Sequence, residues 1–205
     1  MSNPAASSLS QQQVNALLAA QYEDIFAVLG MHQPSPNGSI VVRALLPGAS
    51  AVDVIDCAND QKVASLAMVD AAGLFEGKAG RRRKRFAYRL QVQYPNNTVQ
   101  LHDPYRFGSQ LQDEDLYLFC EGTQEQVYRW MGAHPRTVEG VEGMLFAVWA
   151  PNAKRVSVVG EFNQWDGRRH MMRKHPGAGI WEIFIPQLDA GLNYKYEIIS
   201  GNGQL

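Results

Sequence analysis

The chain has 205 residues, of which 45% are hydrophobic and 19% are charged, and its formal net charge is −1. This length fits one or two domains of about 100 to 150 residues each, and the composition is that of an ordinary soluble globular protein. The net charge gives no field that would draw nucleic acid, and no apolar run approaches the roughly 18 residues of a membrane span. We therefore expect neither a nucleic-acid nor a membrane partner.

The sequence also argues against several special site classes. Residues 1–10 are small and polar and do not resemble a secretory signal, which favours a cytoplasmic location. Cys57 and Cys120 are too few for a disulfide framework, so we expect two free thiols. His170 and His175 have no third ligand nearby, which makes a poor metal site. We therefore predict no metal and no cofactor.

The first predicted element is an amphipathic helix. Ser10 and Gln13 form a capping pair, and apolar residues then recur at helical spacing as far as Leu29. Gly30 ends the pattern. Short β-branched runs follow, which are typical of strands. We predict these strands over residues 39–46, 52–57 and 86–94.

The second half of the chain repeats this order. A second helix is predicted from Thr123 to Met131, with Thr123 and Gln126 as its capping pair and Gly132 as its end. Further strands are predicted over residues 145–149, 155–160, 179–185 and 193–199.

Four short segments also recur in order, at an offset that drifts by only a few residues. Residues 29–32 align with 131–134, 43–47 with 147–151, 73–76 with 179–182, and 88–90 with 194–196. Such self-similarity indicates two copies of one module, each of the size of an immunoglobulin-like sandwich. We therefore predict an all-β fold of two tandem immunoglobulin-like β-sandwich modules with short N-terminal helices. The modules are expected to span residues 1–118 and 119–205, the second truncated at its C-terminal end.

One turn in the second module carries a candidate binding site. It follows a buried strand, and Asn163 and the Asp166-Gly167 pair suit left-handed backbone, which would turn Trp165 outward. An exposed tryptophan offers a flat apolar face that matches the C–H face of a pyranose ring. Lys195 lies between two tyrosines, and if strand alternation turns those inward, Lys195 can donate to sugar oxygens.

At these residues the sequence resembles a known family. The quoted segments are Gly160-Glu161-Phe162-Asn163-Gln164-Trp165-Asp166-Gly167-Arg168-Arg169-His170, Gly179-Ile180-Trp181-Glu182 and Tyr194-Lys195-Tyr196-Glu197. They resemble the carbohydrate-binding module that precedes the catalytic barrel of branching enzymes, and isoamylases and the β subunit of AMP-activated protein kinase carry similar modules. Residues 102–108 and 116–123 are similar to the junction between the two N-terminal modules of bacterial 1,4-α-glucan (glycogen) branching enzymes.

The resemblance implies roles for individual residues. Trp165 falls where the family stacks a glucose ring, Lys195 where it hydrogen-bonds glucan, and Asn163 in the same turn; Trp181 is a further candidate for carbohydrate contact. A second stacking tryptophan of the kinase-type modules has no counterpart in residues 201–205. Residues 54–60 of the first module replace the tryptophan turn without an aromatic platform, which implies a spacer or brace.

The resemblance also implies a reaction for the whole protein. Branching enzymes cleave an α-1,4 bond and form an α-1,6 bond on a (β/α)₈ barrel, whose motifs have no match here. We therefore expect a glucan-binding and positioning segment of a branching enzyme in glycogen biosynthesis, inactive alone. Its expected partners are α-glucan and its own catalytic barrel.

Two other interpretations stay open. Both modules could serve only as a structural brace or interaction module, with Trp165 packed against protein, or the chain could belong to an isoamylase-type debranching enzyme. Trp149 and Trp181 alternate with aliphatic residues, which favours the core for both. The basic run at 81–85 is better interpreted as a solvated loop than as a nucleic-acid patch, and the His102-Asp103 pair as structural.

Overall fold

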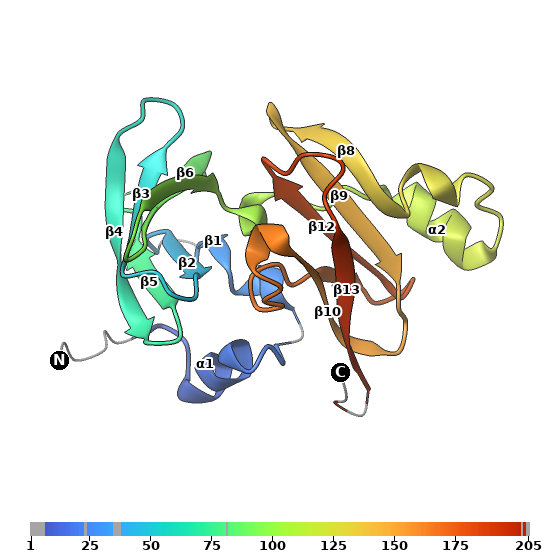
Figure 1. Cartoon of the computed structure of the whole chain (residues 1–205), viewed down its shortest axis with the longest axis horizontal. Coiled ribbons are helices and arrows are strands. Elements are labelled where there is room, and N and C mark those ends of the chain that lie inside the picture. Colours follow the sequence, from blue (N-terminus) through green and yellow to red (C-terminus); the bar gives the residue numbers. More distant parts are fainter. Residues whose placement is uncertain (1–6, 23, 35–37, 81, 202, 204–205) are drawn as a thin grey trace. The chain divides into compact units, whose positions relative to one another are not determined.

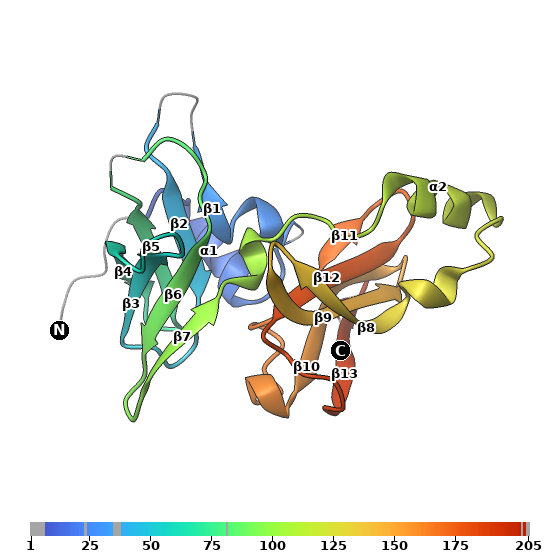
Figure 2. The same cartoon turned by 90° about the horizontal axis from the view of Figure 1, so that it is seen from above.

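The computed structural model describes residues 7–22, 24–34, 38–80, 82–201 and 203 (Figure 1, Figure 2). It is built mostly from antiparallel strands, with two short α-helices, and it divides into two compact units. Unit 1 comprises residues 1–19 and 26–106, and unit 2 comprises residues 20–25 and 107–205. The predicted all-β class with two tandem sandwich modules is confirmed.

Unit 1 contains one seven-stranded antiparallel sheet among the described residues, in the order β1-β2-β5-β4-β3-β6-β7. Its strands are β1 (Gly30–His32), β2 (Val41–Leu45), β3 (Ala51–Asp56), β4 (Lys62–Asp70), β5 (Leu74–Lys78), β6 (Tyr88–Gln93) and β7 (Thr98–His102). The first half of β4 pairs with β3 and its second half with β5. The strand β4 therefore passes from one layer of the sandwich (β3, β6 and β7) to the other (β1, β2 and β5). Apolar side chains from both layers form one buried core, including Val42, Phe75, Val54 and Leu90.

The helix α1 (Gln11–Leu18) begins as predicted. Gln13 N–H donates to Ser10 Oγ at 3.3 Å, and Ser10 N–H donates to Gln13 Oε1 at 2.9 Å. The helix ends at Leu18, well before Leu29, because Ala20 adopts a left-handed φ of 52° that an α-helix cannot contain. The apolar spacing beyond it belongs to a 3₁₀ turn, η1 (Ile25–Ala27), and to buried loop residues. A second such turn, η2 (Pro104–Arg106), ends unit 1.

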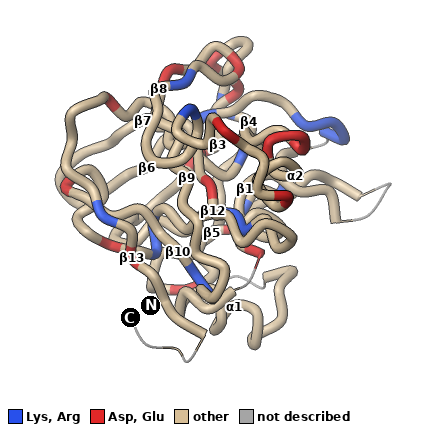
Figure 3. Tube along the Cα trace, turned by 90° about the vertical axis from the view of Figure 1, so that its right-hand side faces the viewer, with Lys and Arg blue, Asp and Glu red and all other residues tan. Residues whose placement is uncertain are grey.

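Unit 2 contains a four-stranded sheet in the order β11-β12-β9-β8 and a β10-β13 pair. Its strands are β8 (Gly132–Val138), β9 (Val141–Trp149), β10 (Ala153–Gly160), β11 (Arg173–His175), β12 (Ile180–Pro186) and β13 (Tyr194–Ser200). The four strands predicted in this half are confirmed as parts of β9, β10, β12 and β13. Lysines, arginines and acidic residues all occur along the trace, in keeping with the small net charge (Figure 3).

The second helix lies upstream of its predicted position. The helix α2 (Asp113–Glu121) ends at Gly122, which has a left-handed φ of 73°, and Thr123 N–H donates to Leu118 O at 3.0 Å. Thr123 therefore closes α2 instead of beginning a helix, and residues 123–131 hold only the 3₁₀ turn η3 (Val127–Arg129). The module boundary expected at 118/119 falls inside α2, whereas the compact units change after Arg106.

The predicted internal repeat is visible in the backbone of each unit. Gly30 and Gly132, with φ of 91° and 101°, begin β1 and β8. Gly30 lies opposite Arg43, and Gly132 lies opposite Ala147, which are aligned positions of the repeat. The histidine two residues after each glycine brings its Nε2 to the carbonyl oxygen three residues before it, at 2.7 and 2.8 Å. The two modules therefore have the same local backbone conformation and the same histidine contact at their first strand.

A glutamate holds the segment that leads into each helix. Ser8 N–H donates to Glu76 Oε1 at 2.9 Å, and Gln110 N–H donates to Glu182 Oε2 at 3.0 Å. Glu76 and Glu182 are aligned residues of the repeat. The segment held by Glu76 runs into α1 and the one held by Glu182 runs into α2, so α2 is the counterpart of α1.

Candidate functional site

The candidate site is the turn that follows β10. After the 3₁₀ turn η4 (Glu161–Asn163), Gln164 and Trp165 both adopt left-handed backbone, with φ of 60° and 59°. The sequence had predicted left-handed backbone at Asn163 and at the Asp166-Gly167 pair, and this prediction was wrong. Trp165 N–H donates to Gly160 O at 2.9 Å, which closes the turn, and the Trp165 side chain is 44% exposed. The outward position predicted for Trp165 is confirmed.

Asn163 lies inside this turn. It is only 3% exposed, and its side chain is occupied on both ends. Its Oδ1 accepts from Gly160 N–H at 2.9 Å, while its Nδ2 donates to Val158 O at 2.8 Å and lies 2.8 Å from His170 Nδ1. The structure thus places Asn163 as a support of the turn, because a buried and fully bonded amide has nothing left to offer a sugar.

The return limb of the turn is fixed by charged side chains. Arg168 donates to both carboxylate oxygens of Asp166, at 2.9 and 2.7 Å. Arg155 from β10 donates to Gly167 O at 3.2 Å and forms an ion pair with Glu197 of β13. A Cβ atom on Gly167 would lie 1.9 Å from Glu197 Oε1, so a larger residue here would displace the Glu197 side chain from its ion pair with Arg155. These contacts tie the turn to both strands of the β10-β13 pair.

Lys195 lies on β13 beside the turn. Its neighbours Tyr194 and Tyr196 face the interior, since the Tyr194 ring packs against Phe146 at 4.9 Å between centroids and Tyr196 O–H donates to the Ala147 carbonyl at 3.3 Å. Strand alternation then exposes Lys195, as expected. Its Nζ lies 5.7 Å from the centre of the Trp165 ring. The structure therefore brings together two of the four candidate residues.

The sequence favoured a core position for both Trp149 and Trp181, and the structure places only Trp181 there. Trp181 is 1% exposed, and its Nε1–H donates to Ala150 O at 3.0 Å, so it is a core residue that presents no surface to a sugar. Trp149 is 58% exposed, and the expectation of a core position for it was wrong. It shares the face of the buried Leu145 and Ala147, and at the end of β9 the centre of the Phe119 ring lies 6.3 Å from that of its own ring.

Two sequence features could have indicated other activities: the basic run at 81–85 and the His102-Asp103 pair. In the structure, residues of both features make contacts within unit 1. In the basic run at 81–85, Arg82 pairs with Asp56 at 2.6 Å and lies 4.2 Å from the centre of the Phe86 ring, whereas Arg81 lies outside the described residues. In unit 1, Asp103 is buried and accepts from Tyr88 O–H at 2.5 Å. Arg82 and Asp103 therefore have structural partners, whereas Arg83, Lys84 and Arg85 of the basic run are exposed.

Burial shifts the pKa of several ionisable groups, among them Asp103 in unit 1 and His170 in unit 2. In unit 1, removal from water raises the pKa of Asp103 to about 6, although hydrogen bonds from Tyr88 and Tyr105 act in the other direction. In unit 2, burial lowers the pKa of His170 to about 4, and the nearby charge of Arg169 acts in the same direction. His170 is therefore neutral at pH 7, which leaves a ring nitrogen free to accept a hydrogen bond.

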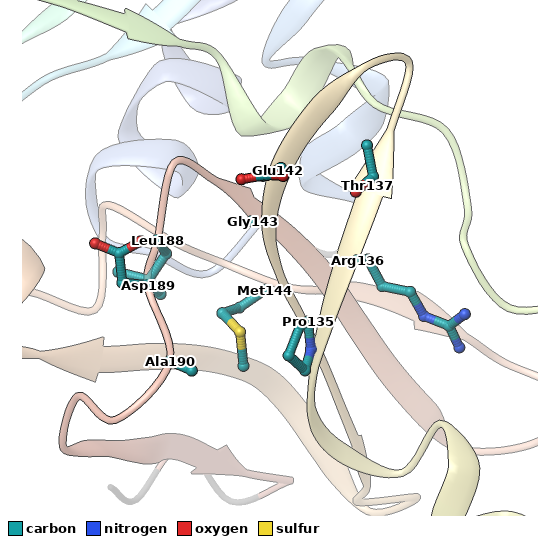
Figure 4. Close-up of a pocket in the computed structure, with 9 residues that line it drawn as sticks. All are labelled: Pro135, Arg136, Thr137, Glu142, Gly143, Met144, Leu188, Asp189 and Ala190. Atoms are coloured by element: carbon teal, nitrogen blue, oxygen red, sulfur yellow. The ribbon is translucent and has the colours of Figure 1, made fainter.

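Sequence reasoning did not find a hollow of about 350 Å³ in unit 2, between the β8-β9 hairpin and the loop after β12 (Figure 4). Met144 extends into it between Pro135 and Ala190, whereas the Arg136 side chain points away. The remaining lining residues are Thr137, Glu142, Gly143, Leu188 and Asp189. They come from three separate segments without a shared motif, so the sequence held no signal for them.

Comparison with known sequence families distinguishes the two units. Residues 10–105 match the family described as "alpha-1,4-glucan branching enzyme GlgB, N-terminal domain", and residues 130–205 match "Carbohydrate-binding module 48 (Isoamylase N-terminal domain)". In chain order, the sequence therefore matches a GlgB N-terminal domain and then a carbohydrate-binding module 48. Trp165 and Lys195 both lie within the carbohydrate-binding module 48 match.

Relatives of the GlgB type match across both domains. The chain is 53% identical over 189 residues to a 1,4-alpha-glucan branching enzyme GlgB of Shewanella sp. (strain MR-4), and 49% identical to that of Shewanella baltica (strain OS223). Each match covers 92% of this chain and 25% of the relative, so the chain spans about a quarter of the length of these curated relatives. A pullulanase structure from Anoxybacillus sp. LM18-11 matches 84% of this chain and 24% of its own, at 13% identity and a TM-score of 0.29.

Proposed function

We propose that unit 2 binds α-glucan through Trp165 and Lys195, and that the chain positions glucan for a 1,4-α-glucan branching enzyme that forms α-1,6 branch points. The observation that carries this proposal is an exposed indole ring held in a left-handed turn next to an exposed lysine. The proposal includes a role in glycogen biosynthesis and a cytoplasmic location, as the sequence led us to expect.

The chemistry of the two side chains suits a sugar polymer. The indole face can stack on the C–H face of a glucose ring, and Lys195 Nζ carries three donors for hydroxyl oxygens. Lys195 Nζ lies over the Trp165 ring, 5.7 Å from its centre, so its donors are close to any sugar that reaches the indole. One stacked ring contributes on the order of 1 to 3 kcal/mol, so a single contact is weak. We expect useful binding only on a polymer that offers many equivalent rings.

We propose a different role for unit 1. Its residues 54–60 stand where unit 2 carries the tryptophan turn, and they contain no aromatic residue. We therefore assign unit 1 to bracing the glucan-binding module and the catalytic barrel of the complete protein. Removal of this unit from the complete enzyme should alter the length of transferred chains without abolishing the reaction, which a product chain-length profile would test.

Affinity electrophoresis tests the glucan site directly. The chain and its Trp165→Ala variant are run in gels with and without glycogen, and we expect glycogen to retard the wild type but not the variant. Trp149→Ala is the matched control, because it removes another exposed tryptophan, on β9, while leaving the turn intact. Retardation lost in both variants, or absent from the folded wild type, would leave only the structural role as a brace.

The alternative class is a debranching enzyme of the isoamylase type, because the description of carbohydrate-binding module 48 includes the isoamylase N-terminal domain. The GlgB N-terminal domain match over residues 10–105 favours branching. Incubation of the complete protein with amylose would separate the two, because branching creates α-1,6 linkages that debranching would only remove.

A further inference from the structure

The turn that presents Trp165 adopts an unfavourable backbone conformation. Gln164 and Trp165 are consecutive, neither is glycine, and both have φ near 60°. Left-handed backbone costs about 1 to 2 kcal/mol for each such residue, because Cβ approaches the following carbonyl oxygen. The orientation of Trp165 therefore depends on contacts that hold the turn from inside.

The amide of Asn163 supplies these contacts, and its orientation is fixed by chemistry. Gly160 N–H can only donate, so the atom 2.9 Å from it must be Oδ1. Val158 O can only accept, so the atom 2.8 Å from it must be Nδ2. A single side chain thus joins the last residues of β10 to the start of the turn.

His170 completes the arrangement from the return limb. The second hydrogen on Asn163 Nδ2 points to His170 Nδ1 at 2.8 Å, so this nitrogen must be an unprotonated acceptor. The backbone of His170 is also held, because Val158 N–H donates to its carbonyl oxygen at 3.0 Å. A hydrogen bond between the Asn163 amide and a neutral imidazole therefore adds a side-chain link between the two limbs of the turn.

We infer that Asn163 and His170 form a positioning pair, which fixes Trp165 beside Lys195 without touching glucan. This inference rests on the proposed glucan site but concerns other residues. The structural reason is that the pair spans the turn at its base, while the exposed indole and the exposed lysine lie outside it. Loss of the pair should release the left-handed turn and disperse the orientations of Trp165.

The test uses Asn163→Ala, His170→Ala and His170→Gln, with His175→Gln as the matched control in the same unit. Two quantities are measured for each folded variant: retardation by glycogen, and the indole N–H cross-peak of Trp165 in a nitrogen–proton NMR spectrum, identified with Trp165→Ala. The two alanine variants should weaken glycogen binding at least about fivefold, the factor that one hydrogen bond of ordinary strength represents. They should also shift or broaden the Trp165 peak while leaving the Trp149 peak in place.

His170→Gln should restore most of the binding, because its amide oxygen can accept from Asn163, and His175→Gln should behave as wild type. This rescue separates positioning from general destabilisation, and it keeps the test decisive if His170→Ala fails to fold. Wild-type binding together with an unchanged Trp165 peak in Asn163→Ala and His170→Ala would overturn the inference. If the wild type itself does not bind glycogen, the proposed function fails, and the Trp165 peak alone decides whether the pair positions the turn.

Discussion

The two units share the local backbone features of the repeat but differ in one turn. This turn follows β3 in unit 1 and β10 in unit 2, the strands that pair with β6 and β13. In unit 1, β3 runs into a tight turn in which Asp60 N–H donates to Asp56 O at 2.9 Å, and the chain continues directly into β4. In unit 2, β10 is followed by the tryptophan turn, and the returning chain makes no continuous strand with β10 but forms an isolated bridge between Ser157 and Met171. One unit uses the turn to extend its sheet, and the other uses it to present side chains.

This difference shows where binding capacity arises in a repeated module. The glycine that begins the first strand, the histidine after it and the glutamate that holds the leading segment are present in both units. These features determine how the module folds. The exposed tryptophan and its supporting pair occur in the turn of only one unit, in keeping with the general rule that a rigid scaffold positions functional loops.

The largest expected difference concerns the two aligned glutamates. Glu76 pairs with the buried guanidinium of Arg43 at 3.0 Å, whereas Ala147 stands opposite Glu182, whose side-chain partners are His175 at 3.0 Å and, in a longer contact, Arg173 at 3.8 Å. Glu76→Gln leaves a buried charge without its partner and should cost unit 1 about 3 kcal/mol, whereas Glu182→Gln keeps an acceptor for backbone N–H groups and should cost unit 2 about 1 to 2 kcal/mol. Native-state hydrogen exchange, followed separately for amides of each unit, measures both. Equal losses would show that Arg43 does not distinguish the two modules.

A second difference lies in how the units respond to pH. The folded-state pKa of Asp103, about 6, is above the value of 3.8 expected for the unfolded chain, so its contribution to the stability of unit 1 is present at low pH and is lost as pH rises from about 4 to 6. The contribution amounts to about 2 to 3 kcal/mol, because each pKa unit represents about 1.4 kcal/mol. Asp103→Asn should remove this pH dependence from the free energy of unfolding of unit 1. A wild-type slope that persists in the variant would assign it to another group.

The features shared by the units were predictable from the sequence, because they depend on residue types with strong local preferences. Glycines at the start of β1 and β8, where φ is positive, marked the repeat, and the Ser10–Gln13 pair marked the start of α1. Glu76 and Glu182 were also visible as aligned residues, although their role in holding the leading segment depends on contacts between residues far apart in the sequence.

The features that distinguish the units were harder to predict, because they depend on tertiary contacts. Thr123 and Gln126 have the spacing of a capping pair. However, α2 ends at the left-handed Gly122, and the N–H of Thr123 is used in the hydrogen bond to Leu118 O that closes this helix. Trp149 has the correct alternation for a core residue, but as the last residue of β9 it remains 58% exposed, although the Phe119 ring packs beside it. Asn163 could be placed in the turn by its type, whereas its burial against His170 depends on the path of the returning chain.

The pH response of unit 2 should run opposite to that of unit 1. The folded-state pKa of His170, about 4, is below the value of 6.5 for the unfolded chain, so its contribution to stability is present above pH 6.5 and is lost as pH falls towards 4. His170→Gln should flatten this dependence in unit 2 and leave unit 1 unchanged, as hydrogen exchange at a series of pH values would show. The same sign of response in both units would contradict the assignment of these two groups.

The smallest expected effect compares left-handed residues in the two turns. Gln164 in unit 2 and Asp60 in unit 1 have φ of 60° and 57°, but aspartate tolerates this conformation better than glutamine because its short side chain can bond locally. Glycine removes the steric cost at either position while adding freedom to the unfolded chain, so Gln164→Gly should stabilise unit 2 by only about 0.5 kcal/mol, and Asp60→Gly should give no gain. The Asp60→Gly variant also loses the ion pair between Asp60 and Arg89, a surface contact whose effect on stability is small. Thermal unfolding of the two variants beside wild type measures the difference. If Gln164→Gly is instead destabilising, the glutamine side chain itself supports the turn, and the strain that we assign to the site is smaller than its dihedral angles indicate.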